Sequence, residues 1–337
     1  MAYRSTVAMA YRSAVWLGNE VWRGNMAGPA NAVGPANAVW PANAVWRGIQ
    51  SGGAMLIRLV PFAFVLLWSS SFIGARVGLR HVTPLLFVEV RLCISAALLV
   101  LAMLVLRRPW HVLRGRWLHC AVAGILVNTV LLDPAHVAMT RMHAAPIALI
   151  QTLNPLLTAL LAWPLLHERL RPWQFLGLGL GVAGVVLIVG LAAGQSPVQL
   201  DLALLTMIGV LGLVSGTLYF GRFCRGVPLL ENATVQFLAA AAAGALAIPL
   251  FETPHADWTT GAIMATLWNA VGVSLGSMVL YLLMLTRGTA ARATANFYLV
   301  PGTAAMLAWL LLGETLTALT VLGLAVSSVG CWLVGRR

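Results

Sequence analysis

From Arg58 onward the sequence consists of apolar runs separated by short polar links, and each run is long enough to cross a bilayer. A hydrocarbon core of about 30 Å requires about 20 helical residues. A backbone in lipid must satisfy its own hydrogen bonds, which helices do. We therefore predict an all-α integral membrane protein with ten transmembrane helices, least sharply bounded at the third, fourth, eighth and ninth. The expected spans are 59–79, 84–106, 118–138, 143–166, 172–193, 201–221, 230–251, 262–286, 291–312 and 316–335.

The composition supports a membrane protein and argues against other classes. Hydrophobic residues make up 60% of the chain and charged residues 9%, against roughly 45–50% and about 25% in soluble domains. The net charge of +12 would suit nucleic acid, but the arginines are scattered in ones and twos rather than gathered in one patch. We therefore expect no nucleic-acid partner. The four cysteines have no metal-ligand spacing, so we expect no metal and no other cofactor.

The arginines predict the orientation of the chain. With a cytoplasmic N-terminus, 17 of the 21 basic residues lie on the cytoplasmic side, against Arg76, Arg80 and Arg141 on the other, while Arg91 lies within the second span. Dropping the five arginines at or before Arg58 leaves 12 against 3. The positive-inside rule then predicts a multi-pass protein of the inner (cytoplasmic) membrane with both termini in the cytoplasm.

Residues 1–57 differ from the rest of the chain. MAYRS occurs twice and PANAV three times, a short repetition with Pro and Gly that cannot form a spanning segment. We predict a low-complexity, disordered extension, with a tethering tail as the alternative. Met55, followed by LIRLVPFAFVLLW, is the more natural start, and no cleavable signal peptide precedes the first span.

One apolar block occurs twice. NPLLTALLAWPLLHERL, residues 154–170, returns 146 positions later as VPGTAAMLAWLLLGETL, residues 300–316. Composition alone explains scattered Leu and Ala matches, but not Pro, Trp, Glu and Gly in one register. Each half holds five spans, an odd number, so the second copy must enter the membrane from the opposite side. We predict two inverted five-helix repeats, 58–194 and 195–337, an architecture typical of secondary transporters.

Several stretches together resemble the EamA branch of the drug/metabolite transporter superfamily. They are LWSSSFIGARVGL in the first span, TPLLFVEVRL at the second, and the two copied blocks with the glycine-rich segments that follow them. The resemblance covers residues 59–337 and implies ten helices, an inverted repeat and transport of small metabolites. Ser69 departs from it by replacing the usual Gly after Trp68, which weakens the expectation of tight helix contact there. His167 replaces the Gly before Glu168.

Polar residues inside spans are costly and usually face a wet cavity or the protein interior. Gln151, Asn154 and Thr158 form one helical stripe that the second copy does not repeat, which suggests a substrate bound off the pseudo-twofold axis. The alternative is interhelical hydrogen bonding, worth about 0.6 kcal/mol for each bond. The full predicted substrate-binding set is Trp68, Ser71, Gln151, Asn154, Thr158, Ser274, Ser277, Tyr281, Asn296 and Tyr298.

Three ionisable residues within the spans are candidates for proton coupling: Glu89, Asp133 and His136. Asp133 and His136 stand at i, i+3, a spacing that would let them hydrogen-bond or share a proton. The alternative for all three is a buried structural pair with side chains that extend toward the interface. Arg91 stands two residues from Glu89 and points to another side of the helix, so we expect a structural role, as its match to a family arginine also implies.

Four further residues are predicted to be structural. Glu168 and Glu314 end the copied helices and are expected to cap the start of the next helix in the chain. Pro155 and Pro301 are expected to interrupt the backbone hydrogen bonds of spans 4 and 9.

The sequence therefore favours a secondary carrier that moves a small organic metabolite, an amino acid or similar compound, across the bilayer by alternating access. Export is favoured by the family resemblance alone. The rival hypothesis is a membrane-embedded lipid-modifying enzyme, but the chain lacks HExxH, paired aspartates and a phosphate-binding loop. A receptor would need a sizeable extramembrane domain, and only short loops are present.

Overall fold

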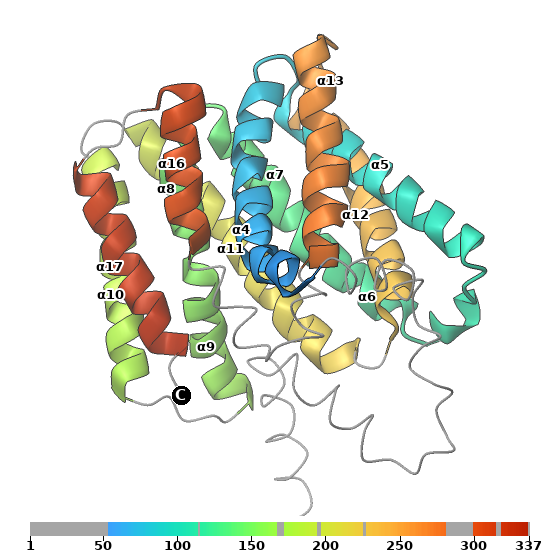
Figure 1. Ribbon diagram of the computed structural model, residues 1–337, viewed down its shortest axis with the longest axis horizontal. Helices are drawn as coiled ribbons and strands as arrows, with labels where there is room; N and C mark the ends of the chain where they lie inside the picture. The colour runs from blue at the N-terminus through green and yellow to red at the C-terminus, as the bar shows by residue number, and fades with distance from the viewer. Residues whose placement is uncertain are drawn as a thin grey trace, which may run out of the picture.

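The computed structural model describes residues 53–113, 115–166, 172–193, 197–224, 227–280, 299–314 and 318–335. Within these ranges the protein is almost entirely helical (Figure 1). The extension 1–52 lies outside the described residues. The elements are α4 (Gly53–Gly78), α5 (Pro84–Val105), η2 (Trp110–Leu113), α6 (Trp117–Gly124), η3 (Ile125–Thr129), α7 (Val130–Met139), α8 (Ala144–Gln151), α9 (Leu153–Leu166), α10 (Pro172–Ala193), α11 (Pro197–Phe223), α12 (Leu229–Phe251), α13 (Thr260–Leu267), η4 (Trp268–Gly276), α16 (Val300–Leu312) and α17 (Ala318–Gly335).

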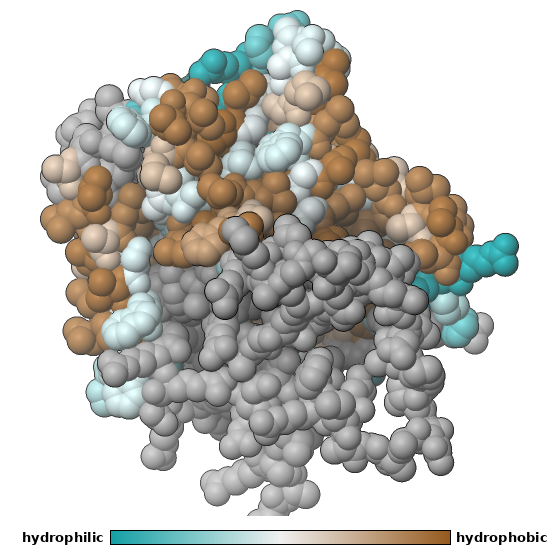
Figure 2. All heavy atoms as spheres, viewed as in Figure 1, coloured by the Kyte–Doolittle hydropathy of each residue, from teal (hydrophilic) through white to brown (hydrophobic). Residues whose placement is uncertain are grey.

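The described helices occupy part or all of every expected span. Six helical segments are long and apolar enough to cross a membrane, and three shorter apolar helices lie within α10, α16 and α17. Figure 2 shows that apolar side chains cover much of the described surface and that hydrophilic residues gather toward its ends. The prediction of an all-α integral membrane protein is therefore confirmed.

The fourth span was expected to be one helix, but it consists of α8 and α9, which are separated at Thr152. A proline ring clashes with the carbonyl four residues earlier and removes one donor. Pro155 stands four residues after Gln151, the last residue of α8, so the break lies where the proline requires it. Pro301, in contrast, lies in the first turn of α16, where a proline costs no helical hydrogen bond.

Spans 3 and 8 contain π-helical segments that the periodicity did not predict. η3 follows α6, and η4 follows α13. Side chains bond to the backbone at both places: Asn128 Nδ2 donates to the Gly124 carbonyl at 3.1 Å, and Ser274 Oγ donates to the Asn269 carbonyl five residues earlier, also at 3.1 Å. π-Helical turns are rare in proteins, and those that are found often lie at functional sites.

The 146-residue offset relates more than the copied block. Adding 146 to the bounds of α5 gives 230–251, and α12 is Leu229–Phe251; the same shift places η3 at 271–275, within η4. The helix pairs that pack together are related by the same shift of 146 residues. α4 packs against α16 as α11 packs against α9, and α12 packs against α6 as α5 packs against η4.

Helices α10 and α17 pack closely side by side (Figure 1). A Cβ atom on Gly184 would lie 2.7 Å from the Gly323 carbonyl oxygen, and one on Gly330 would lie 2.6 Å from that of Gly177. As the residue number on α10 rises, the number of the residue that it contacts on α17 falls, so the two helices run antiparallel. Small residues of this kind allow two helix backbones to approach closely.

Candidate functional site

Glu89 lies in a buried position on α5. Its Oε1 accepts a hydrogen bond from Cys93 Sγ at 3.0 Å, while Oε2 is buried without a hydrogen-bond partner. A Cβ atom on Gly244 of α12 would collide with Oε2, so the glycine leaves the space that the carboxylate fills. A buried carboxylate with one open acceptor is a place where a proton can bind.

Asp133 and His136 lie on α7, which packs against α5, the helix that carries Glu89. Asp133 is half-buried and His136 is buried. His136 does not bond to Asp133, contrary to what the i, i+3 spacing suggested. Its Nδ1 donates to the Leu132 carbonyl at 2.7 Å, and its buried Nε2 has no hydrogen-bond partner. The local helix geometry supplies a nearer acceptor than the Asp133 side chain.

Arg91 points away from Glu89, toward the π-helix of span 8. Its Nε donates to Ser274 Oγ at 3.1 Å and its Nη1 to Asn269 Oδ1 at 3.2 Å. Ser95 Oγ donates to the Ala270 carbonyl at 3.1 Å one turn farther along α5. Arg91 thus joins two spans. The Ser274 hydroxyl is engaged within the protein, whereas the buried Ser277 hydroxyl has no partner.

The structure divides the predicted polar stripe of span 4. Gln151 ends α8, whereas Asn154 and Thr158 lie on α9 beyond the break. Thr158 Oγ1 donates to Asn154 Oδ1 at 3.3 Å, and both residues are half-buried. This pair therefore has polar surface left for a ligand.

On α4, Trp68 and Ser71 are half-buried, and the Trp68 ring lies 5.7 Å from that of Phe64. Ser69 between them is fully buried, and its Oγ donates to the Val300 carbonyl of α16 at 3.1 Å. The expectation that Ser69 weakens helix contact here is wrong, because the hydroxyl itself bonds the two helices together.

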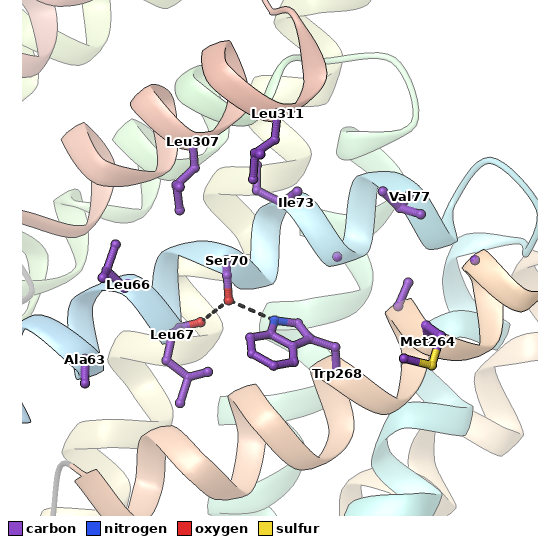
Figure 3. A pocket seen from close by; sticks show the side chains of 13 residues that line it. Ala63, Leu66, Leu67, Ser70, Ile73, Val77, Met264, Trp268, Leu307 and Leu311 are labelled. Atoms are coloured by element: carbon purple, nitrogen blue, oxygen red, sulfur yellow. Dashed lines mark hydrogen bonds between the residues drawn. The ribbon is translucent and has the colours of Figure 1, made fainter.

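A groove of about 630 Å³ lies between α4, α13, η4 and α16 (Figure 3). Its polar atoms satisfy one another: Trp268 Nε1 donates to Ser70 Oγ at 2.9 Å, and Ser70 Oγ donates to the Leu67 carbonyl at 2.7 Å. The remaining lining is apolar and includes Leu66, Met264 and Leu311. The groove therefore suits acyl chains better than a polar solute. Sequence reasoning missed Trp268, which looked like one more apolar residue of span 8.

Glu314 acts at a helix N-terminus, but that helix is α8 rather than the next helix in the chain, as had been expected. Its Oε2 accepts from Ala144 N at 3.1 Å, and its Oε1 pairs with Arg76 Nε at 3.2 Å. The α8 terminus lies close because α16 packs against α8. Glu252 does the same at α5, where its oxygens accept from Leu85 N at 2.9 Å and Leu86 N at 3.1 Å.

Sequence reasoning also missed Glu231. It occupies the first turn of α12, is 1% exposed, and has no partner for either carboxylate oxygen. A Glu at this place usually reaches back to the N-cap N–H, but here the N-cap is Pro228, which has none. The sequence signal for this unpartnered carboxylate was a Glu three residues after a proline.

Four of the predicted site residues cannot be placed: Glu168, Tyr281, Asn296 and Tyr298 lie outside the described residues. Among the described residues, two groups stand out. The first consists of the ionisable residues Glu89, Asp133 and His136 on α5 and α7, and the second is the Asn154–Thr158 pair on α9.

Comparison with known proteins gives one family. Residues 55–190 and 202–336 each match the model of the EamA-like transporter family. The uncharacterized inner membrane transporter YedA of Escherichia coli is 26% identical over 266 residues, 79% of this chain and 86% of that protein. A probable terminal-alkyne amino-acid exporter of Streptantibioticus cattleyicolor is 28% identical over 291 residues, 81% of this chain and 91% of that protein.

The uncharacterized transporter YoaV of Bacillus subtilis is 22% identical over 272 residues, 80% of this chain and 92% of that protein. One solved crystal structure has the same fold, with a TM-score of 0.61 and 23% sequence identity. It covers 84% of this chain and 98% of its own.

Proposed function

Because the chain belongs to the EamA-like transporter family, we propose that it is a secondary active transporter that moves a small organic metabolite by alternating access. The observation that carries this proposal is the reciprocal, antiparallel packing of α10 and α17. Two copies of one helix that run in opposite directions imply two halves of opposite topology. Such halves can open a shared site to either side of the membrane in turn.

Two further observations support the division into repeats 58–194 and 195–337. The family model matches the chain twice, and the two matches start 147 residues apart, at 55 and 202. The π-helical segments of spans 3 and 8 also correspond. With both termini in the cytoplasm, reporter fusions after residue 194 and at the C-terminus should lie on opposite sides of the membrane. Reporters on the same side would refute the inversion.

The substrate we propose is an amino acid or a similar metabolite, moved outward. A relative of similar length is named as a probable amino-acid exporter, and the Asn154–Thr158 pair offers amide and hydroxyl groups that suit a polar solute. Efflux from overexpressing and deletion cells, screened against amino acids, nucleosides and toxic analogues, tests this. Asn154→Leu should abolish the efflux while the membrane content of protein stays unchanged. Leu156→Met, a volume-conserving change in the core next to the pair, is the control.

We also propose that transport is coupled to protons through Glu89 and Asp133. The support is the open, buried acceptor of Glu89 and the half-buried carboxylate of Asp133 on α7, the helix that packs against α5. Glu89→Gln and Asp133→Asn should each remove accumulation against a gradient while leaving downhill exchange. Transport that is insensitive both to these changes and to a collapsed proton gradient would contradict the coupling.

A further inference from the structure

We propose that Arg76 and Glu314, with the apolar side chains beneath them, form a closed gate at one end of the transport path. The inference rests on the proposed function, since only a carrier needs an end that closes and opens. It concerns the end of the molecule where α4 and α16 finish and α8 begins, which we call the Arg76 end.

The ion pair joins four helices at one point. Glu314 follows Gly313, whose φ of 67° ends α16 in the left-handed conformation. Its Oε1 lies 3.2 Å from Arg76 Nε on α4, and its Oε2 accepts from Ala144 N at the start of α8. Arg76 Nη1 also donates to the Met139 carbonyl at the end of α7. Separating the helices at this end would break all of these contacts.

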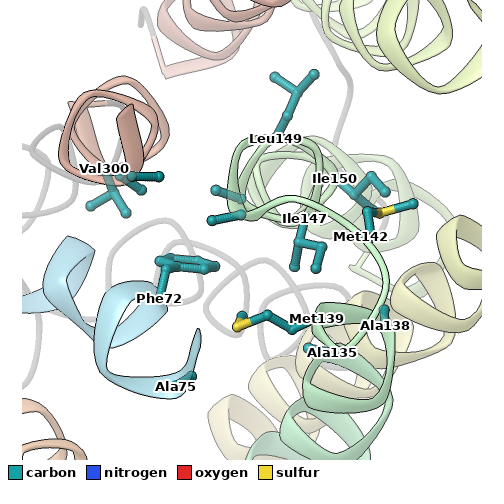
Figure 4. Packing of buried hydrophobic residues seen from close by; sticks show 14 of the residues in the cluster. Phe72, Ala75, Ala135, Ala138, Met139, Met142, Ile147, Leu149, Ile150 and Val300 are labelled. Atoms are coloured by element: carbon teal, nitrogen blue, oxygen red, sulfur yellow. The ribbon is translucent and has the colours of Figure 1, made fainter. Parts of the chain in front are cut away.

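Apolar side chains from the same four helices are buried together in one cluster (Figure 4). Phe72 comes from α4 and Val300 from α16, while Met139 and Ile147 come from α7 and α8. All four side chains are buried in one cluster. Packed apolar clusters have few voids large enough for a water molecule, so this one hinders the passage of water and polar solutes.

The second half of the chain does not show the same burial. Adding 146 to Ser69 and Arg76 gives Ser215 and Arg222, so both residue types recur on α11. Ser69 is buried against Val300 and Arg76 is paired. Ser215 and Arg222, however, are exposed, and the Arg222 guanidinium lies over the Phe223 ring at 5.5 Å. Equivalent residues of the two halves are therefore bonded at one end of the protein and exposed at the other. Alternating access requires such an asymmetry between the two ends.

The pair is suited to opening and closing. The Arg76 and Glu314 side chains are 21% and 10% exposed, so the pair lies close to the surface rather than deep in the protein. A pair deep in the protein would be left uncompensated on breaking, at a prohibitive cost. At this depth, water can solvate the two groups once they separate.

The test is thiol labelling of Ser71→Cys, which places a reporter on α4 about 7 Å from the level of Arg76, at 1.5 Å per residue. A membrane-impermeant maleimide is applied to right-side-out vesicles and, separately, to inverted vesicles. Labelling of the chain without the reporter gives the background of the native cysteines. With the gate intact, the reporter should react slowly from the Arg76 end, whichever vesicle presents it.

Arg76→Gln and Glu314→Gln should each speed this labelling about tenfold, which corresponds to a shift of roughly 1.4 kcal/mol toward the open state. Gln at 314 keeps an oxygen for Ala144 N, so a residue that only caps α8 would show no change. Arg76→Lys, which keeps the charge but cannot make both directed bonds, should label at a rate between those of the native chain and of Arg76→Gln. Arg141→Gln, an exposed arginine at the same end, is the matched control.

Unchanged labelling in both Gln variants, or an equal increase in Arg141→Gln, would overturn the gate. If Arg76→Gln fails to insert, Glu314→Gln decides alone, because it retains the helix cap. The measurement needs no substrate. Transport is measured in the chain that keeps Ser71 and the native ion pair. Faster labelling of the Gln variants with no detectable transport by that chain would reject the proposed function and keep the gate, whereas transport by that chain with unchanged labelling would reject the gate only.

Discussion

Ser327 Oγ donates a hydrogen bond to the Gly181 carbonyl at 3.2 Å, and the two residues stand 146 positions apart, the separation of the copied segments. A position in one copy therefore bonds to the same position in the other. Such self-pairing is expected where a twofold axis passes between two copies. Gly184 and Gly330 lie on either side of this point, each facing the other helix.

Gly330→Ala should therefore lower the stability of the protein. The added Cβ would lie 2.6 Å from the Gly177 oxygen and from Gly181 N, both backbone atoms that cannot rotate away. We expect a loss of about 1–3 kcal/mol, the usual cost of overpacking. Gly179→Ala on the facing helix is the control, because nothing lies within 4 Å of its Cβ position. Thermal unfolding in detergent compares them, and equal midpoints would contradict the close contact.

Glu231→Gln should raise stability. The wild-type carboxylate is buried with both oxygens unpartnered, and removing its charge reduces the cost of burial by about 1 kcal/mol or more. Glu252→Gln is the opposite case, since its two oxygens accept from Leu85 N and Leu86 N. It should lose about 0.5–2 kcal/mol. If the unfolding midpoints of both variants move in the same direction, hydrogen bonds to the carboxylate do not decide whether the Gln substitution stabilises or destabilises the protein.

Arg91→Lys should weaken the contact between α5 and η4. An ammonium group cannot reproduce the two directed bonds from Nε and Nη1 to Ser274 and Asn269. The expected loss is about 1.5–3 kcal/mol, the value of hydrogen bonds to charged groups. Arg80→Lys, at an exposed position, should be neutral. If the two variants unfold at the same temperature, Arg91 does not hold the spans together.

Cys224, just beyond the end of α11, should resist alkylation. Burial, and then the neighbouring Cys120 thiol, raise the pKa of the Cys224 thiol to about 12. Because the thiolate is the nucleophile, a raised pKa leaves little reactive form at neutral pH. Maleimide should modify Cys224 slowly at neutral pH, faster as the pH rises, and fully after denaturation. Rapid modification of the folded protein at pH 7 would contradict the burial.

Much of the architecture could be predicted, because membrane spans are long and apolar and the repeat preserves rare residues. Gly184 and Gly330 stand 146 positions apart, and each packs against the helix that carries the other. The break at Thr152 was also within reach, since Pro155 was identified. The π-helices were not, because one extra residue in a turn leaves the apolar pattern unchanged.

The candidate site was harder to predict, because its contacts cross between spans. Glu314 was expected to cap a helix, yet which helix depends on the packing of α16 against α8. Ser69 looked like a defect in helix contact until its partner, the Val300 carbonyl, was known. The unpartnered Glu231 follows from a proline N-cap, which the sequence shows, but a carboxylate at the end of a span is more often in contact with water.

The two glutamate caps also have a consequence for biogenesis. The N–H groups that begin α5 and α8 are satisfied by Glu252 and Glu314, residues that leave the ribosome some 166 to 170 positions later. During synthesis, the first five spans reach the bilayer before either carboxylate exists. Until then, the N–H groups at the starts of α5 and α8 must bond to water in the headgroup layer. A nascent chain arrested at its midpoint thus lacks both of these helix caps, which only the second half of the chain supplies.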